Sequence, residues 1–468
     1  MKIQLTSFCA ASLLLSSTTN AQELMIHNID IVSTNNAILL AATAPIMDMD
    51  MPMGQSSSLL PEDDVFDNDD LFGTPGGGYV HPFIGIEGLY TDNVYNVDFD
   101  HTSDFLTTVS PGIWFSLPSR KEVPLSLAAN NTSAGGLQAA LPEYEGFDRI
   151  NAYLLGSLDF INYSEESHLS DWTGIVQGLF KYNFRGGLSL EVVDGYTRGL
   201  DSLDVGNFNQ AEQRQFNSNI FIADADWLFT EKLRAKIEYS NFYLDYDDTI
   251  DEFMNRSDNA FAVYGYFNYS LKTSLYLQYE FIDVSYDTAE LKDNQQNFIY
   301  GGIDWDSTNK TAFSLKAGYQ HRSYKNSRVN DTIEASENVS NYALALELAF
   351  RYKVTDKTGL TLEAFHKLEE TDTFNALNKT VLGGTLRYEQ ELTERLQAIC
   401  DMRYENADYG QIGGERDDHT YEVRPALQYV FKDWLMAEIA YKYEIRDSSA
   451  DFFDYDTNNL SFSLTAAL

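Results

Sequence analysis

Charged residues at every second position are the feature of this sequence that could carry chemistry. Residues two apart on a β-strand project from the same face. Facing rows of opposite charge can set a transverse field and select the solutes that pass a pore. The alternative is that interior charges pair across strands, which keeps them solvated and braces the wall. Nine such residues lie in three successive segments: Asp401, Arg403, Glu405, Glu422, Arg424, Glu438, Lys442, Glu444 and Arg446.

No catalytic or cofactor-binding pattern accompanies these charges. The seven histidines are scattered, and neither a Gly-x-Ser-x-Gly elbow nor a phosphate-binding glycine loop occurs. Cys400 lies on an apolar face with Ala398 and Met402, where a thiol is an inert, lipid-facing side chain rather than a nucleophile. A triad assembled from distant strands would leave no such pattern. We predict that the protein is not an enzyme and holds no cofactor.

Four methionines near the N-terminus form a weak candidate metal site. They are Met47, Met49, Met51 and Met53, and they alternate with aspartate and proline. Thioether clusters can bind Cu(I). Methionines in a flexible segment more often bind nothing, so a copper site is the weaker of the two interpretations.

The charged rows are one half of a strict alternation. Near the C-terminus the apolar half consists of Leu435, Ala437, Ile439, Tyr441, Tyr443 and Ile445. This period predicts strands with one apolar and one polar face. A sheet that closes on itself within a bilayer hides its edges, with the apolar face against lipid and the polar face lining a lumen. We predict an all-β protein, a transmembrane antiparallel up-and-down β-barrel of about 18 strands.

One apolar row favours a barrel over a soluble sandwich. The row is aromatic at both ends and aliphatic between them: Tyr342, Leu344, Leu346, Leu348, Phe350 and Tyr352. Aromatic side chains gather at the two membrane interfaces, with an aliphatic band between them. The opposite row, from Ala343 to Arg351, mixes small and charged residues, as expected for a wet lumen.

The connections between strands alternate between short and long. The turn at 230–232 is tight, whereas the connection at 247–257 is longer and acidic. Short turns in the periplasm and long loops outside are typical of bacterial outer-membrane barrels. Residues 117–148 break this rule, and we predict a periplasmic insertion there. The alternative is an additional strand at 123–129, which would make the number of strands odd.

The N-terminal part of the chain differs from the rest. Residues 1–21 have a basic start, an apolar run and small residues before Ala21, which predicts a signal peptide. Residues 22–77 carry acidic clusters and prolines but no Lys or Arg, which predicts a flexible acidic periplasmic leader. Residues 78–468 would form the barrel. We expect it in the outer membrane of a Gram-negative bacterium, in contact with lipid and with the barrel-assembly machinery.

The composition agrees with a membrane barrel and excludes one class of partner. The chain has 468 residues, long enough for one large barrel or two or three ordinary domains. It has 30 Tyr and 29 Phe but only 5 Trp, a balance that favours strands at a bilayer. The net charge of −39 would repel nucleic acid. The acidity either keeps long loops soluble or attracts cations to a vestibule.

The first predicted hairpin resembles a known family. Residues 88–95 (Gly-Leu-Tyr-Thr-Asp-Asn-Val-Tyr), followed by 103–105 (Ser-Asp-Phe) and 109–113 (Val-Ser-Pro-Gly-Ile), resemble the opening of a family of outer-membrane β-barrel porins. That family is commonly encoded with exopolysaccharide or capsule biosynthesis genes and has no established catalytic residues. Beyond this hairpin the resemblance extends over residues 79–468 only as a regular succession of hairpins. Two departures are Leu468, where an aromatic residue is usual, and the long segment at 117–148.

The resemblance implies export of an exopolysaccharide or capsular polysaccharide across the outer membrane. Its partners would then be the polysaccharide chain and periplasmic export machinery. The alternative is a general or cation-selective diffusion porin. A sugar path would need aromatic and hydroxyl surfaces, and Tyr264, Tyr266 and Tyr276 are candidates whose facing the sequence does not decide.

Overall fold

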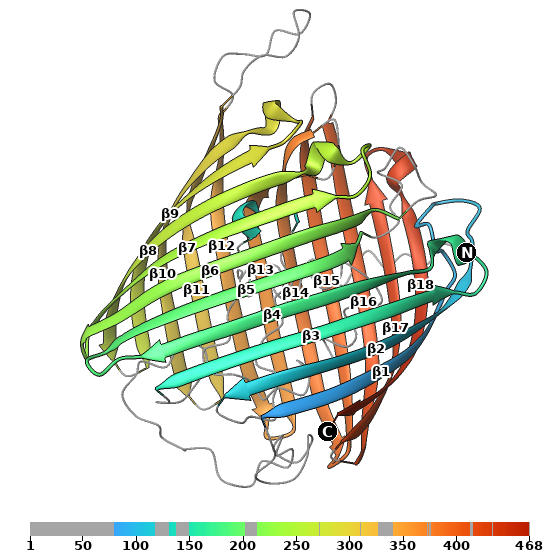
Figure 1. Ribbon diagram of the computed structural model, residues 1–468, viewed down its shortest axis with the longest axis horizontal. Helices are drawn as coiled ribbons and strands as arrows, with labels where there is room; N and C mark the ends of the chain where they lie inside the picture. The colour runs from blue at the N-terminus through green and yellow to red at the C-terminus, as the bar shows by residue number, and fades with distance from the viewer. Residues whose placement is uncertain are drawn as a thin grey trace, which may run out of the picture.

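Eighteen antiparallel strands close into a single barrel. The structure is a computed structural model and describes residues 79–117, 131–136, 149–201, 213–270, 272–308, 310–325, 340–371, 373, 376–411, 415–432 and 434–467. Each strand pairs with the next one along the chain, and β1 also pairs with β18. Figure 1 shows the strands tilted and wrapped into one closed wall. The predicted fold class and number of strands are confirmed.

The strands take up most of the described residues. Their bounds are β1 Val80–Thr91, β2 Asp104–Leu117, β3 Ile150–Tyr163, β4 Asp171–Asn183, β5 Leu188–Leu200, β6 Gln215–Thr230, β7 Leu233–Tyr246, β8 Arg256–Ser270, β9 Thr273–Tyr286, β10 Asn294–Thr308, β11 Thr311–Tyr324, β12 Ser340–Thr355, β13 Thr358–Glu369, β14 Ala376–Thr393, β15 Leu396–Gln411, β16 Glu415–Lys432, β17 Leu435–Ser448 and β18 Tyr455–Ala467. The predicted signal peptide, the leader and its four methionines lie outside the described residues. Within the described part of the chain, no helix has the length and apolar character needed to cross a membrane.

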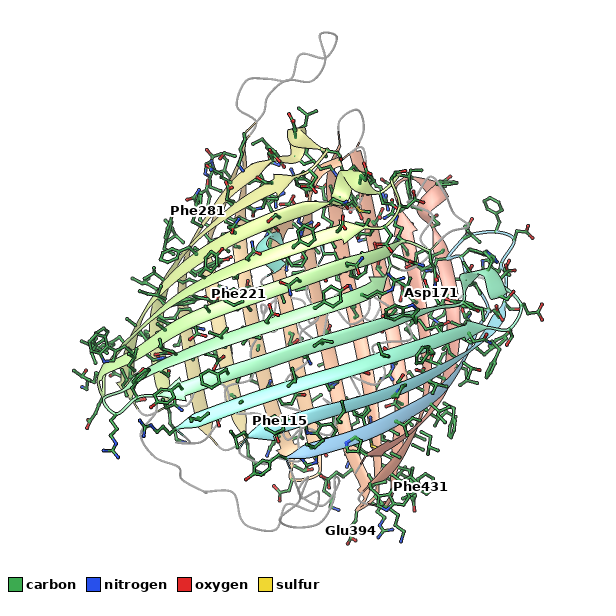
Figure 2. The ribbon with its side chains drawn as sticks, viewed as in Figure 1. Phe115, Asp171, Phe221, Phe281, Glu394 and Phe431 are labelled. Carbon is green, nitrogen blue, oxygen red and sulfur yellow. The ribbon has the colours of Figure 1, made fainter. Side chains whose placement is uncertain are left out.

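Alternate side chains along each strand point to opposite faces of the barrel wall. On β17, Ile439 is 48% exposed, whereas its neighbour Glu438 is 4% exposed. Figure 2 shows Phe115, Phe221 and Phe281 on the outer surface of the wall. The outer face is therefore apolar along most strands, which is the arrangement found in barrels that cross membranes.

Short turns join the strands at the end of the barrel where β1 begins and β18 finishes, which we call the turn end. Hydroxyl groups close several of these turns. Thr230 Oγ1 accepts a hydrogen bond from the backbone N–H of Lys232 (3.2 Å), and Thr355 Oγ1 accepts one from Lys357 (3.1 Å). Gly187, between β4 and β5, has φ +83°, a conformation that glycine adopts without strain.

Longer connections lie at the opposite end of the barrel, which we call the loop end. Asp104 is 3% exposed there, and its carboxylate accepts hydrogen bonds from the consecutive backbone N–H groups of residues 164–166, at 3.1, 3.0 and 2.8 Å. Tyr95 donates a hydrogen bond to Glu166 Oε2 (2.9 Å). Burial, reinforced by this carboxylate, raises the pKa of Tyr95 to about 12. Buried carboxylates thus order the connections at this end.

One pair of neighbouring strands is joined over only part of its length. The ladder between β12 and β13 runs from Thr355–Thr358 at the turn end to Leu346–His366. Beyond that point residues 340–345 of β12 pair with β11 alone among the described residues. The end of β13 stays paired with β14. The wall therefore divides between β12 and β13 toward the loop end.

Candidate functional site

The nine charged residues singled out in the sequence lie on the inner face of β15, β16 and β17. Their side chains are buried or half-buried, whereas Met402, which alternates with them, is 46% exposed on the outer face. The register sets Asp401 opposite Arg424, and Arg403 opposite Glu422. The structure thus brings residues of opposite charge side by side on neighbouring strands.

Ion pairs connect the row from strand to strand. Arg424 forms an ion pair with Glu438 of β17, and its Nη1 lies 3.7 Å from Asp401 Oδ2 of β15. Along β15, Arg403 Nη2 lies 2.6 Å from Glu405 Oε2. Opposite charges therefore alternate across three strands. Because each charge has an opposite charge beside it, the electric field of the row across the lumen is partly cancelled.

The C-terminal part of the row is paired in the same way. Lys442 Nζ lies 2.9 Å from Glu444 Oε2, and Glu444 Oε1 accepts a hydrogen bond from the Tyr455 hydroxyl (2.5 Å). The Arg446 guanidinium lies 4.8 Å from the centre of the Tyr455 ring, a cation–π contact. Glu422 lies opposite Glu444 in the ladder. Lys442, Glu444 and Arg446 are therefore each held in place by a neighbour, whereas Glu422 faces a residue of like charge on β17.

Arg387 of β14 also belongs to this row, although it was not among the residues predicted from the sequence. Its Nε lies 2.7 Å and its Nη2 3.3 Å from the two oxygens of Asp401, a bidentate pair of the strong kind. Leu386 and Tyr388, on either side of it, are exposed on the outer face. The same alternation that identified the other residues would have placed Arg387 in the row. The charged inner row, from Arg387 to Arg446, spans β14 to β17.

Further ion pairs line the inner face toward the turn end of β6 to β12. They are Arg234–Asp226 (2.7 Å), Lys236–Glu238 (2.8 Å) and Lys316–Glu347 (3.1 Å). The sequence analysis did not single out these residues. Their positions follow the same period of two, which also pairs Lys236 with Glu238 along β7, but the pairs Arg234–Asp226 and Lys316–Glu347 depend on the register between strands.

The three candidate tyrosines of a sugar path lie on the inner face beside these ion pairs. Tyr266 is stacked 6.0 Å from Tyr264 and lies 5.3 Å from Tyr276, between ring centres. Arg234 lies 4.5 Å from the Tyr266 ring, and Lys236 lies 5.7 Å from the Tyr264 ring. The protein's own cations therefore occupy positions over these rings.

A short segment from the connection between β2 and β3 lies inside the barrel. The Gly135 backbone N–H donates a hydrogen bond to Asp258 Oδ2 (2.8 Å), and Arg256 Nη2 donates one to the Ser133 carbonyl (3.1 Å). Arg256 and Asp258 lie on the inner face of β8 near the loop end and are almost fully buried. In Figure 1 this short segment lies behind β6 and β7.

This position differs from the periplasmic insertion that we predicted for residues 117–148. The six described residues, 131–136, contact the inner wall near the loop end, although β2 ends at the turn end. The physical reason is that Gly135 and Ser133 offer backbone groups to a buried Arg–Asp pair, whereas the sequence shows the glycines only as breakers of regular structure. Residues 118–130, including the alternative strand at 123–129, and residues 137–148 lie outside the described residues.

Part of the inner wall is apolar, in contrast to the wet lumen that the alternation predicts. Gly136 has φ +61°, and a Cβ atom there would lie 2.6 Å from Phe242 Cδ2 and 3.2 Å from Ile220 Cδ1. Both side chains belong to an apolar cluster on the inner face of β2 to β7 that also contains Trp114, Leu155, Leu179, Val193 and Phe216. An internal segment packs on this face, so apolar side chains there are removed from water.

The connection between β13 and β14 also folds into the lumen. Glu370 is fully buried, accepts hydrogen bonds from the Tyr286 hydroxyl (2.7 Å) and Gln296 Nε2 (2.8 Å), and lies 3.0 Å from Arg322 Nη2. Its backbone N–H donates to the Thr132 carbonyl (2.8 Å). Residues 131–136 and 369–371 thus meet inside the barrel, and we call them the inner constriction.

The described part of the chain shows no metal centre beside these features. Among the residues that the structure describes, no group of three or more His, Cys, Asp or Glu side chains is placed to hold a metal ion. The methionine candidate lies outside those residues.

A closed barrel with an apolar outer face, a charged inner row and segments folded into its lumen defines a porin-like membrane barrel. The chain belongs to the family described as "Putative beta-barrel porin 2", whose model matches residues 211–468. The match includes β6 to β18. The first hairpin, which carries the resemblance seen in the sequence, lies outside the matched residues.

The barrel is similar to solved structures from Pseudomonas aeruginosa and Acinetobacter baumannii, among others. OccK2 (OpdF) from Pseudomonas aeruginosa is 10% identical with a TM-score of 0.44, over 83% of this chain and 98% of that one. OccAB4 from Acinetobacter baumannii is 10% identical with a TM-score of 0.42, over 86% and 100%. OccK5 (OpdH) from Pseudomonas aeruginosa is 12% identical with a TM-score of 0.42, over 84% and 100%. No curated protein matches the chain.

Proposed function

We propose that the protein is a diffusion porin of the outer membrane of a Gram-negative bacterium, with a weak preference for cations. The observation that carries this proposal is the charged inner row from Arg387 to Arg446, because paired charges on an inner wall provide a wetted path for small polar solutes. Membership of a porin family supports the same function. The inner constriction would limit the size of the solutes.

The preference for cations rests on the loop end. Lys and Arg residues in the described loop-end connections are Arg214, Lys292 and Lys325. Acidic residues are far more numerous there and include Asp98, Asp100, Asp248, Asp251, Asp287, Glu290, Asp451 and Asp454. A negative mouth raises the local concentration of cations. The charged inner row adds little to this preference, because its charges are largely paired.

Polysaccharide export, which the first hairpin implied, has no support from the family match or from the structural comparisons. Diffusion of small solutes fits this barrel better. The candidate tyrosines are in contact with Arg234 and Lys236 rather than forming an unoccupied aromatic track.

Conductance of the purified protein in planar lipid bilayers tests the proposal. We expect a steadily open pore whose reversal potential in a KCl gradient indicates a preference for K⁺. The preference should weaken as salt rises from about 0.1 M to about 1 M, because the Debye length falls from about 10 Å to about 3 Å. A silent barrel, or a preference for Cl⁻, would contradict the proposal.

A further inference from the structure

The divided wall between β12 and β13 lies within the part of β12 that would cross the membrane. The outer row from Tyr342 to Tyr352 covers about eleven residues, the length that a tilted strand needs to span a bilayer core. Tyr342 and Leu344 are 60% and 61% exposed on this face. The ladder with β13 stops at Leu346, so the last positions of the span have no ladder partner on β13.

Side chains of β11 hold the end of β13 inside the barrel. Gln320 Oε1 accepts a hydrogen bond from the Leu368 backbone N–H (2.9 Å), and Gln320 Nε2 donates to the Leu368 carbonyl (3.1 Å). Arg322 Nη1 donates to the Glu369 carbonyl (3.0 Å). β11 is two strands away from β13 in the sheet. The end of β13 has therefore passed behind β12, where side-chain bonds replace the missing ladder.

The space between the two strands is lined by apolar and mostly small side chains. Ala343 and Ala345 lie on the inner face of β12 and Leu368 lies on β13, all less than 10% exposed. Phe365 lies further inside, on the lumen face of β13, where it packs with Ala376 and Val381 of β14. Ala134 of the inner constriction packs against the cluster that contains Ala345. On the outer side, His366 Nδ1 lies 2.6 Å from the carbonyl of Leu344, on the unjoined part of β12. Apolar side chains thus line part of the way from the outer surface to the lumen, and the polar contacts of His366, Gln320 and Arg322 cross it.

We propose that the barrel opens laterally between β12 and β13 and passes a single-chain amphiphile between the lumen and the outer half of the membrane. Backbone hydrogen bonds seal the rest of a barrel wall, because unpaired polar groups are costly in hydrocarbon. Here the side-chain bonds of Gln320 and Arg322 to β13, rather than a backbone ladder, have to break. The apolar chain lies among Ala343, Ala345 and Leu368, and the polar head reaches Gln320 and Arg322 on the lumen side. This route is separate from axial diffusion of small solutes.

Photolabelling of the full-length protein in lipid nanodiscs tests this route. The probe is dodecanoic acid with a diazirine at the end of its chain. We expect labels on Phe365 and Leu368, which are buried behind the wall, as well as on Leu344 outside it. Ile222, on the inner face of β6 far along the wall, is the control that stays unlabelled. Labels confined to outward-facing side chains, or equal labelling of Ile222, would overturn the lateral route.

A reversible cross-link provides a second test. In a Cys400→Ser background, Leu344→Cys and Leu368→Cys would face each other if the Leu346–His366 register continued. Their disulfide should lower labelling of Phe365 at least ten-fold, and a reductant should restore it. The matched control is Phe350→Cys with Leu362→Cys, a pair within the intact ladder.

Equal labelling of Phe365 with the two cross-links would refute the route. If the first pair does not oxidise, the photolabelling of the unmodified protein decides alone. Ion conductance of the same samples reports separately on the diffusion porin, so the two proposals fail independently.

Discussion

Arg424 shows how one side chain can set the net charge of the charged inner row. It pairs with Glu438 and lies near Asp401, so Arg424→Gln leaves one additional negative charge inside the lumen. We expect the permeability ratio of K⁺ to Cl⁻ to rise, on the order of two-fold at low salt, where the charge is least screened. Reversal potentials in a KCl gradient measure this change. The control is Arg395→Gln, an exposed residue at the turn end, and an equal rise in both variants would contradict the role of the row.

Asp104 is the second residue whose removal has a definite consequence. Its carboxylate accepts three backbone N–H groups of residues 164–166, which Asp104→Ala leaves without this acceptor. The Ser164 N–H keeps the Phe105 carbonyl (3.1 Å), whereas the N–H groups of Glu165 and Glu166 lose their carboxylate acceptor, so we expect the connection between β3 and β4 to open locally. Protease cleavage within 164–170 of the folded barrel should become faster. Asp98→Ala, at an exposed position, should leave cleavage unchanged.

The spacing of residues along a strand predicts which face each side chain lies on, but not which side chain it contacts on the next strand. The spacing of Asp401, Arg403 and Glu405 predicts that they share a face, because side chains alternate on a strand. It does not predict the contact between Arg387 and Asp401, which depends on the register of β14 against β15. Glu370 is a stronger example. Its partners on β9, β10 and β11 come together only after a connection has folded into the lumen.

At the scale of a strand, the outer row of β12 makes a testable case. Leu346 is half-buried on the outer face, near the middle of the row from Tyr342 to Tyr352. Leu346→Arg places a guanidinium in the hydrocarbon and should destabilise the barrel by about 2–4 kcal/mol. The fraction that shows heat-modifiable mobility after folding into lipid measures the loss. Leu346→Met is the control, and an undiminished folded fraction for the Arg variant would count against the outward placement.

Strands and turns were predictable from the sequence where one face is polar and the other apolar. The alternation on β17 and the tight turn at 230–232 are examples, and the number of strands followed from them. On β6 the sequence around Ile220, Phe221 and Ile222 is apolar on both faces, so alternation alone could not show that the inner face packs against an internal segment. The division between β12 and β13 was equally hidden, because it depends on Gln320 binding the backbone of a strand two places away.

For the whole barrel, the position of the inner constriction governs the open area of the lumen. Gly136→Val would place a side chain against Phe242 at a backbone conformation that costs about 1–3 kcal/mol for a residue other than glycine. We expect residues 131–136 to lose their contacts with the inner wall and the single-channel conductance to increase. Planar-bilayer recordings measure this conductance. Gly265→Ala is the control, since nothing lies within 4 Å of its added carbon. A conductance equal to that of the unmodified protein would show that the segment does not limit the pore.

The contact between β1 and β18 sets the order of events when the barrel forms. Phe83 lies opposite Ala467, so the first strand finds its second neighbour only after the last strand has emerged. Pairings between positions so remote along a chain are slow to form. Until then one edge of β1 is unpaired, and its backbone groups can pair with another extended chain. Such pairing leads to aggregation. A variant that delays hairpins in the middle of the chain would therefore prolong this vulnerable period, even if the finished barrel were equally stable.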